Sequence, residues 1–199
     1  MMDFIAGNLA LDFVNTVGYR LGDSKEYLAA PEDLSVWAQQ AGILLDGAGL
    51  RVTRAHMGRI RAIREELYRL FHTLASGGAP SSRVLAPLNA RLAGLAAKRE
   101  LRTGGGAVEW VWTGAVHDPV RVLGPVLSSA AELLASGSYR RIRECRGEQC
   151  GWLFLDRSRA GRRVWCSMAD CGNREKGRRH YQRVRKPAGG GRARRNRAP

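Results

Sequence analysis

The sequence predicts a mainly α-helical protein: a helical N-terminal domain with one β-hairpin, followed by a small cysteine-rich C-terminal module. Over most of residues 1–137, apolar residues recur with the period of amphipathic helices, about 3.6 residues. Around residues 100–114 the period shortens to two, which is typical of strands. All four cysteines then fall within residues 145–171. We therefore expect a helical domain at 1–137, a compact module at 138–186 and a disordered basic tail at 187–199.

The first predicted helix runs from Asp3 to Val17, because Leu9, Phe13 and Val17 repeat at helical spacing. Three small polar residues would share another side of this helix: Asp12, Asn15 and Thr16. They could line a pocket for a small-molecule effector, or they could serve only as hydrogen-bonding groups near the helix end. Such residues are common on helices, so the residues themselves favour the second interpretation and leave the first open.

The other helices are predicted from their end signals. Pro31 opens a short helix, because the fixed φ of proline suits the first helical turn. Thr53 suits the N-cap of the longest helix, at about residues 54–76. Two further helices are expected to begin at Ser81 or Ser82 and at Asp118.

Residues 100–114 are predicted to form a β-hairpin that turns at the glycines of 104–106. Val108, Trp110 and Trp112 alternate along the second strand and would share one face. Exposed tryptophans could stack on nucleic-acid bases, but burial of an apolar face is their commoner use. We therefore expect the helices to cover this face.

The cysteines form two pairs of C-x4-C spacing separated by fifteen residues: Cys145 with Cys150, and Cys166 with Cys171. Four thiolates in two close pairs suit tetrahedral Zn2+. Because four protein ligands fill the shell and leave no position for water, we expect one structural zinc ion rather than a catalytic one. Two disulfides or four unligated thiols are the alternatives. Disulfides require an oxidising compartment, and the chain begins without the basic and apolar runs of a secretory signal.

The spacer between the cysteine pairs is predicted to fold back as a hairpin. Its strands would be the apolar segments 152–155 and 164–165, joined through the polar segment 156–161. Residues 174–185 follow the last cysteine without a proline and are predicted to be helical. Knuckle, hairpin, knuckle and helix is the order of a zinc ribbon or a treble clef.

The positive charge of the chain is concentrated beside the cysteines. Residues 1–137 carry 14 Lys and Arg against 13 Asp and Glu, whereas residues 138–199 carry 19 against 5. The C-terminal part therefore holds nearly all of the net charge of +15. This asymmetry predicts a polyanionic partner, most simply a nucleic acid.

The helix after Cys171 is the predicted contact element, because Arg174, Arg178, Tyr181 and Arg185 recur on one of its faces. The predicted nucleic-acid-binding residues are Arg174, Lys176, Arg178, Arg179, Tyr181, Arg183 and Arg185. They would contact the phosphate backbone of double-stranded DNA or read base edges in its major groove. An RNA-binding protein that uses the same basic module is one alternative, and a zinc-stapled protein-interaction module is another.

Two sequence motifs resemble a known bacterial family. The run Cys171-Gly172-Asn173-Arg174, preceded by RRVWCSM at 162–168, resembles the CGNR zinc-finger signature. The segment GNLALDFVNT at 7–16 is similar to the opening motif of the helical ABATE domain that precedes that finger. The resemblance implies a transcriptional regulator with a zinc-bound, DNA-binding C-terminus. The chain departs from the pattern at Val164, which separates the paired arginines from Trp165.

Several classes of function find no support in the sequence. The helical part has no nucleophile beside a base, no carboxylates clustered with histidine and no phosphate-binding glycine loop, so we expect no enzyme. No apolar stretch approaches the roughly 18 residues of a membrane span. We expect a soluble, cytoplasmic protein, and a homodimer is compatible with this composition.

Overall fold

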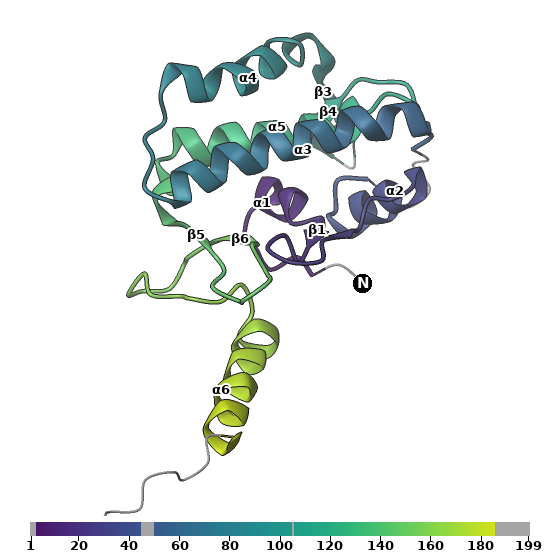
Figure 1. The fold of residues 1–199 in the computed structure, drawn as a ribbon. Helices are drawn as coiled ribbons and strands as arrows, with labels where there is room; N and C mark the ends of the chain where they lie inside the picture. Colours follow the sequence, from purple (N-terminus) through teal and green to yellow (C-terminus); the bar gives the residue numbers. More distant parts are fainter. Residues whose placement is uncertain (1–2, 45–49, 105, 186–199) are drawn as a thin grey trace, which may run out of the picture.

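The computed structural model describes residues 3–44, 50–104 and 106–185. Helix α1 (Leu9–Val14) contacts both α3 (Arg54–Ala75) and α5 (Val120–Ala135), and α4 (Ser82–Ala93) contacts the same two helices. Figure 1 shows α1 and α4 on opposite sides of α3. The predicted basic tail, 187–199, lies outside the described residues.

The core of the helical part is built from aromatic and branched aliphatic side chains. Phe13 of α1 packs against Trp37 of α2 (Pro31–Gln40), with ring centroids 5.3 Å apart. Both side chains are buried, together with Phe71 of α3 and Val126 of α5. The helices therefore share one continuous apolar core.

The predicted helix starts at Pro31, Thr53 and Ser81 are confirmed. The sequence predicts that Asp118 caps a further helix and that Pro119 is its first residue. Helix α5 begins one residue later, at Val120, and the carboxylate of Asp118 accepts a hydrogen bond from the Val120 N–H at 2.9 Å. Helix starts can be predicted from the sequence because helix capping depends only on residues within about one turn.

The prediction of a first helix from Asp3 to Val17 is wrong at both ends. The side chain of Asn8 caps α1 by accepting hydrogen bonds from the N–H groups of Ala10 and Leu11. At the other end, the strand β1 (Val17–Gly18) pairs with β2 (Lys25–Glu26). Tertiary pairing therefore shortens a helix whose apolar spacing continues beyond it.

The predicted hairpin is confirmed as β3 (Arg99–Gly104) and β4 (Ala107–Trp112), which follow the short 3₁₀ helix η1 (Ala96–Lys98). The expectation that helices cover its apolar face is wrong, because Val108 is 64% exposed and Trp110 is 55% exposed. Trp112, at the end of β4, lies with its ring against Gly124 of α5. The rest of the hairpin extends past that contact.

The C-terminal module begins after α5. The 3₁₀ helix η2 (Ser138–Arg141) leads into β5 (Ile142–Glu144), which pairs antiparallel with β6 (Leu153–Leu155). Ile142, Leu153 and Leu155 are buried in the same core cluster as the helices. The apolar core is thus continuous across the boundary predicted at residue 137.

The strand pairing predicted inside the cysteine spacer is wrong. Strand β6 pairs with β5 rather than with residues 164–165, which form no strand. The carbonyl of Val164 instead accepts a hydrogen bond from the Arg146 N–H at 3.2 Å. The first cysteine pair lies in the loop of the β5–β6 hairpin, and this loop brings those two strands together.

The chain continues through a π-helical turn, η3 (Met168–Gly172), into α6 (Asn173–Arg185). Figure 1 shows α6 extending away from the rest of the molecule. Among the described residues, every helix is too short or too polar to cross a lipid bilayer.

Candidate zinc centre and nucleic-acid interface

The four cysteine Sγ atoms form a single cluster of the size that a tetrahedral zinc site requires. All four side chains are buried, and their Sγ atoms lie within 4.8 Å of one another. The Sγ atom of Cys166 is 3.7 Å from that of Cys150 and 3.6 Å from that of Cys171. Zinc–sulfur bonds of about 2.3 Å in a tetrahedron require sulfur separations of roughly 3.8 Å. The cysteines are thus positioned to bind one zinc ion, and they form no disulfide.

Two separate elements supply the two cysteine pairs. Cys145 and Cys150 lie at the ends of the loop that joins β5 to β6. Cys166 precedes η3, and Cys171 lies within it, two residues before Asn173, the first residue of α6. The metal therefore joins the hairpin to the base of α6, which fixes the start of this helix.

Backbone and arginine donors surround the sulfurs. The Sγ atom of Cys145 accepts from the Gly147 N–H at 3.5 Å and from the Cys166 N–H at 3.3 Å. The guanidinium of Arg174 donates to the Cys171 Sγ at 3.1 Å. Such donors offset the negative charge that four thiolates place on a zinc ion and orient the ligands.

The thiols also affect one another's pKa. Hydrogen bonds from Cys150 and Cys166 hold the pKa of Cys145 far below that of an ordinary thiol. The pKa of Cys150 and that of Cys166 are both raised, chiefly by hydrogen bonding to Cys145. Zinc must displace protons from these thiols when it binds, so zinc affinity increases with pH.

The second cysteine pair is held in place by Arg163. Its guanidinium donates to the carbonyls of Trp165 and Cys166 and lies 4.4 Å from the ring centroid of Phe154. The inserted Val164 does not disturb a strand, because no strand forms there. Of the paired arginines in this motif, Arg163 has a structural role, and Arg162 remains at the surface.

The opening segment of the chain docks onto the zinc module. The side-chain amide of Asn15 donates to the Leu153 carbonyl at 2.8 Å and accepts from the Leu153 N–H at 3.0 Å. The indole N–H of Trp152 donates to the carbonyl of Val17 at 2.8 Å. The hydroxyl of Tyr68, on α3, donates to the Gly151 carbonyl at 3.0 Å. These contacts join the hairpin of the zinc module to both α1 and α3.

The other two predicted effector residues also make internal hydrogen bonds. Asp12 accepts from the Ala6 N–H at 3.0 Å. Thr16 donates to the Phe13 carbonyl at 2.7 Å and accepts from the buried guanidinium of Arg64 at 3.2 Å. An effector pocket at Asp12, Asn15 and Thr16 stays a prediction, and none of the three lines the cavities described below.

Burial strongly affects the carboxyl group of Asp12. Desolvation raises its pKa to about 6, although the hydrogen bond from the Ala6 N–H acts in the opposite direction. This carboxyl group therefore titrates close to neutral pH. It lies three residues before Asn15, which contacts the zinc module.

Helix α6 is attached near its base, where Glu175 is buried and Arg178 forms an ion pair with Glu148 of the β5–β6 loop at 3.6 Å. Glu175 is 9% exposed and is its one buried residue, and every residue from Lys176 to Arg185 is exposed. Tyr181 is 71% exposed. A helix gains most of its stability from packing of an apolar face, and α6 has no such face within the described part of the chain.

The structure divides the predicted nucleic-acid-binding residues into two groups. Arg174 donates to Cys171, and Arg178 and Arg179 form ion pairs with Glu175 at 2.9 Å and 2.7 Å. The remaining residues are exposed, and their side chains have no hydrogen bond or ion pair to any described residue: Lys176, Tyr181, Arg183 and Arg185. The outer part of α6 is therefore its free basic surface.

Two further arginines lie in a groove of about 640 Å³ beside the first knuckle. The side chains of Arg146 and Arg162 both line it and have no hydrogen-bond or ion-pair partner among the described residues. Their proximity depends on the backbone hydrogen bond between Arg146 and Val164. Sequence reasoning missed this pair, and its only sequence signal is that both residues flank a cysteine motif.

Comparison with known families agrees with this architecture. Residues 7–137 match the ABATE family, described as "Putative stress-induced transcription regulator", and residues 141–184 match the CGNR zinc finger. A comparison with curated proteins found no match. The second matched segment contains all four clustered cysteines, and the first covers well over half of the chain. The chain therefore belongs to the ABATE family and carries a CGNR zinc finger at its C-terminal end.

Proposed function

We propose that this regulator binds double-stranded DNA through its zinc module, with α6 as the main contact element. The observation that supports the proposal is the outer part of α6, where the side chains of Lys176, Arg183 and Arg185 are exposed and have no ion-pair partner among the described residues. Concentrated arginine and lysine that the protein itself does not neutralise favours a polyanionic partner.

The shape of α6 suits a major groove. A helix with its side chains is about 10–12 Å across, close to the groove width of about 12 Å. The segment from Lys176 to Arg185 spans roughly 15 Å. Because the metal fixes the base of the helix, its insertion into the groove costs little additional conformational entropy.

The groove arginines, Arg146 and Arg162, would bind flanking phosphates. Arginine contacts to phosphate supply affinity and register, whereas contacts to base edges supply sequence preference. In this arrangement Arg146 and Arg162 bind phosphates that flank the major groove, while Arg183 and Arg185 bind phosphates that line it. We propose a binding function without catalysis, carried out in the cytoplasm.

The helical part would position this module. Its core continues into the β5–β6 hairpin, so a change in α1 or α3 acts directly on the element that carries the zinc ligands. This arrangement fits a regulator in which one part receives a signal and the other binds nucleic acid.

Recovery of the bound polymer tests the proposal. The full chain is crosslinked in cells and purified, and its nucleic acid is then treated separately with DNase and RNase. Enrichment of discrete duplex DNA segments is expected. Enrichment of RNA would favour the RNA-binding alternative, and recovery of neither polymer would favour a protein-interaction module.

A further inference from the structure

A cavity of about 590 Å³ lies between α3 and α4, on the side of α3 away from α1. We propose that this cavity binds a small amphipathic carboxylate, a molecule with an aliphatic or aromatic body and one acidic head group. The volume falls within the range of small-molecule sites, roughly 300–1,000 Å³. This inference does not depend on DNA binding, because the cavity lies away from the zinc module's basic surface.

Apolar side chains from three helices form the walls. Leu67 and Leu70 project from α3, Leu88 from α4 and Leu127 from α5, and all four are buried against the core. These side chains can cover the hydrocarbon part of a ligand. They supply no donor for its polar end.

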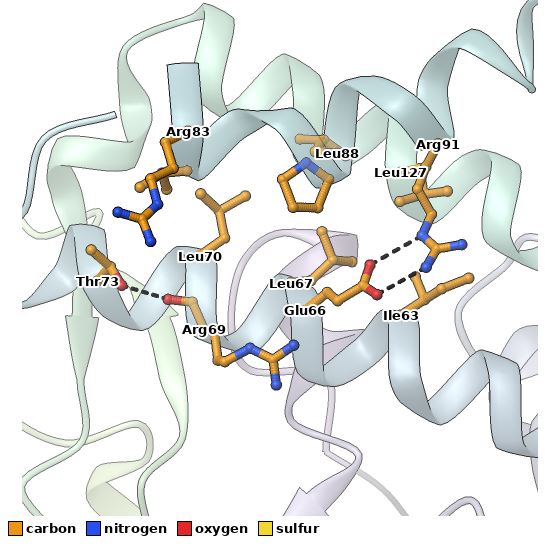
Figure 2. Close-up of a pocket in the computed structure, with 12 residues that line it drawn as sticks. Ile63, Glu66, Leu67, Arg69, Leu70, Thr73, Arg83, Leu88, Arg91 and Leu127 are labelled. Carbon is orange, nitrogen blue, oxygen red and sulfur yellow. Dashed lines mark hydrogen bonds and ion pairs between the residues drawn. The ribbon is translucent and has the colours of Figure 1, made fainter. Parts of the chain in front are cut away.

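Charged side chains at the cavity indicate that the ligand carries a negative charge. Three arginines and one glutamate line it: Arg69, Arg83, Arg91 and Glu66. Glu66 forms two hydrogen bonds with Arg91, at 3.1 Å and 2.9 Å, so these two charges neutralise each other. The guanidinium groups of Arg69 and Arg83 have no hydrogen-bond or ion-pair partner among the described residues. Figure 2 shows the Arg69 side chain extending away from α4, so the cavity keeps one positive charge without an acid, that of Arg83.

Figure 2 shows how these groups are arranged. The Glu66–Arg91 pair bridges α3 and α4 at one end, and Arg83 reaches from α4 toward α3 at the other end. Leu67 and Leu70 lie between these two ends. A carboxylate at Arg83 would thus place its apolar body along the leucines, and the planar guanidinium suits two parallel hydrogen bonds to a carboxylate.

The packing of α4 leaves it able to adjust to an occupant. Leu88 is its one buried residue, and Pro87 removes a backbone donor from the helix interior. Helix α3 lies between the cavity and the zinc module, because Tyr68 on the same helix donates to Gly151. A ligand in the cavity would therefore lie one helix away from the DNA-binding module.

Calorimetric titration of the full-length, zinc-loaded protein with decanoate tests the proposal, with decanol as the uncharged probe of equal chain length. Decanoate is expected to bind with a stoichiometry of one per chain. Decanol is expected to bind about fivefold more weakly, or more weakly still. Arg83→Gln should weaken decanoate binding about tenfold and leave decanol unchanged. Val84→Phe, which enlarges a half-buried lining residue, should weaken both probes.

Arg59→Gln provides the matched control, because Arg59 is an exposed arginine of α3 that does not line the cavity. It should leave both affinities unchanged, and thermal unfolding verifies that each variant is folded. The proposal is overturned if decanoate binds without saturation or if decanol binds equally well. It is also overturned if Arg59→Gln and Arg83→Gln weaken decanoate binding equally.

Discussion

The side-chain amide of Asn15 binds the backbone of Leu153 in the way that a neighbouring strand would. It donates to the Leu153 carbonyl at 2.8 Å and accepts from the Leu153 N–H at 3.0 Å. Asn15 follows α1, and Leu153 is the first residue of β6. Both residues are buried. A single amide therefore joins the opening motif of the chain to the strand that follows the first cysteine pair.

Removal of this amide should destabilise the protein. In Asn15→Ala, both backbone groups of Leu153 lose their partners while buried, at a cost of roughly 2–4 kcal/mol in the free energy of unfolding. Urea denaturation measures the loss. Asn89→Ala, at an exposed position of α4, should change stability by less than about 0.5 kcal/mol. Equal stability of the two variants would show that the amide has no such role.

Zinc removal should affect more than the C-terminal module. In Cys166→Ser the ion loses a ligand, and the sequence alone predicts that the helical part stays folded without it. The shared core predicts instead that Ile142, Leu153 and Leu155 become exposed and that α1 loses protection. Hydrogen exchange of the α1 amides measures this. Unchanged protection in a variant shown to be zinc-free would mean that the helical part is independent.

Arg174 should contribute to zinc retention. Its guanidinium donates to the Cys171 Sγ, and loss of such a donor typically lowers metal affinity about 10–100-fold. Arg174→Ala is therefore expected to release zinc to a competing chelator at least about tenfold more readily. Lys176→Ala removes a charge from the same helix without touching a sulfur and should behave as the wild type. If both variants release zinc equally, general charge rather than the sulfur contact is responsible.

Asp12 should make stability depend on pH. Its pKa is about 6 in the folded protein against 3.8 for an ordinary aspartate, so between these values the folded state holds a proton that the unfolded state has released. Stability from this group is therefore highest at low pH and is lost as pH rises through 6. Asp12→Asn should stabilise the protein by up to about 3 kcal/mol above pH 7, and the gain should shrink by about 1 kcal/mol at pH 5.

The pH effect is measured as the difference in unfolding free energy between wild type and variant, with excess zinc present. Because the difference is taken at each pH, titration of the cysteine ligands cancels. Asp23→Asn, at an exposed position, should give no comparable gain. A stability difference that does not change with pH would contradict the account of Asp12.

The features that the sequence predicted correctly depend on local chemistry. The helix starts at Pro31 and Thr53 follow from groups within one turn of each other, and the zinc ligands follow from the spacing of four cysteines. Recognition of the two motifs at the ends of the chain led to the family that the comparisons show.

The features that the sequence missed depend on contacts between distant segments. Strand β6 pairs with β5 because the knuckle loop closes that hairpin, which no periodicity indicates. Trp110 is exposed because the hairpin extends past α5, although its alternation is that of a half-buried strand. The role of Asn15 requires knowledge of Leu153, which lies more than a hundred residues away in the sequence.

DNA affinity measured across a series of salt concentrations tests the central claim most directly. Wild type is compared by fluorescence anisotropy with Arg183→Ala/Arg185→Ala and with Arg54→Ala/Arg59→Ala, which removes two exposed arginines from α3. Each phosphate contact contributes about −0.9 to the slope of log affinity against log salt. The α6 variant should bind more weakly with a slope shallower by roughly two, while the α3 variant matches the wild type. Equal slopes for all three proteins, or no binding to duplex DNA at low salt, would contradict the account.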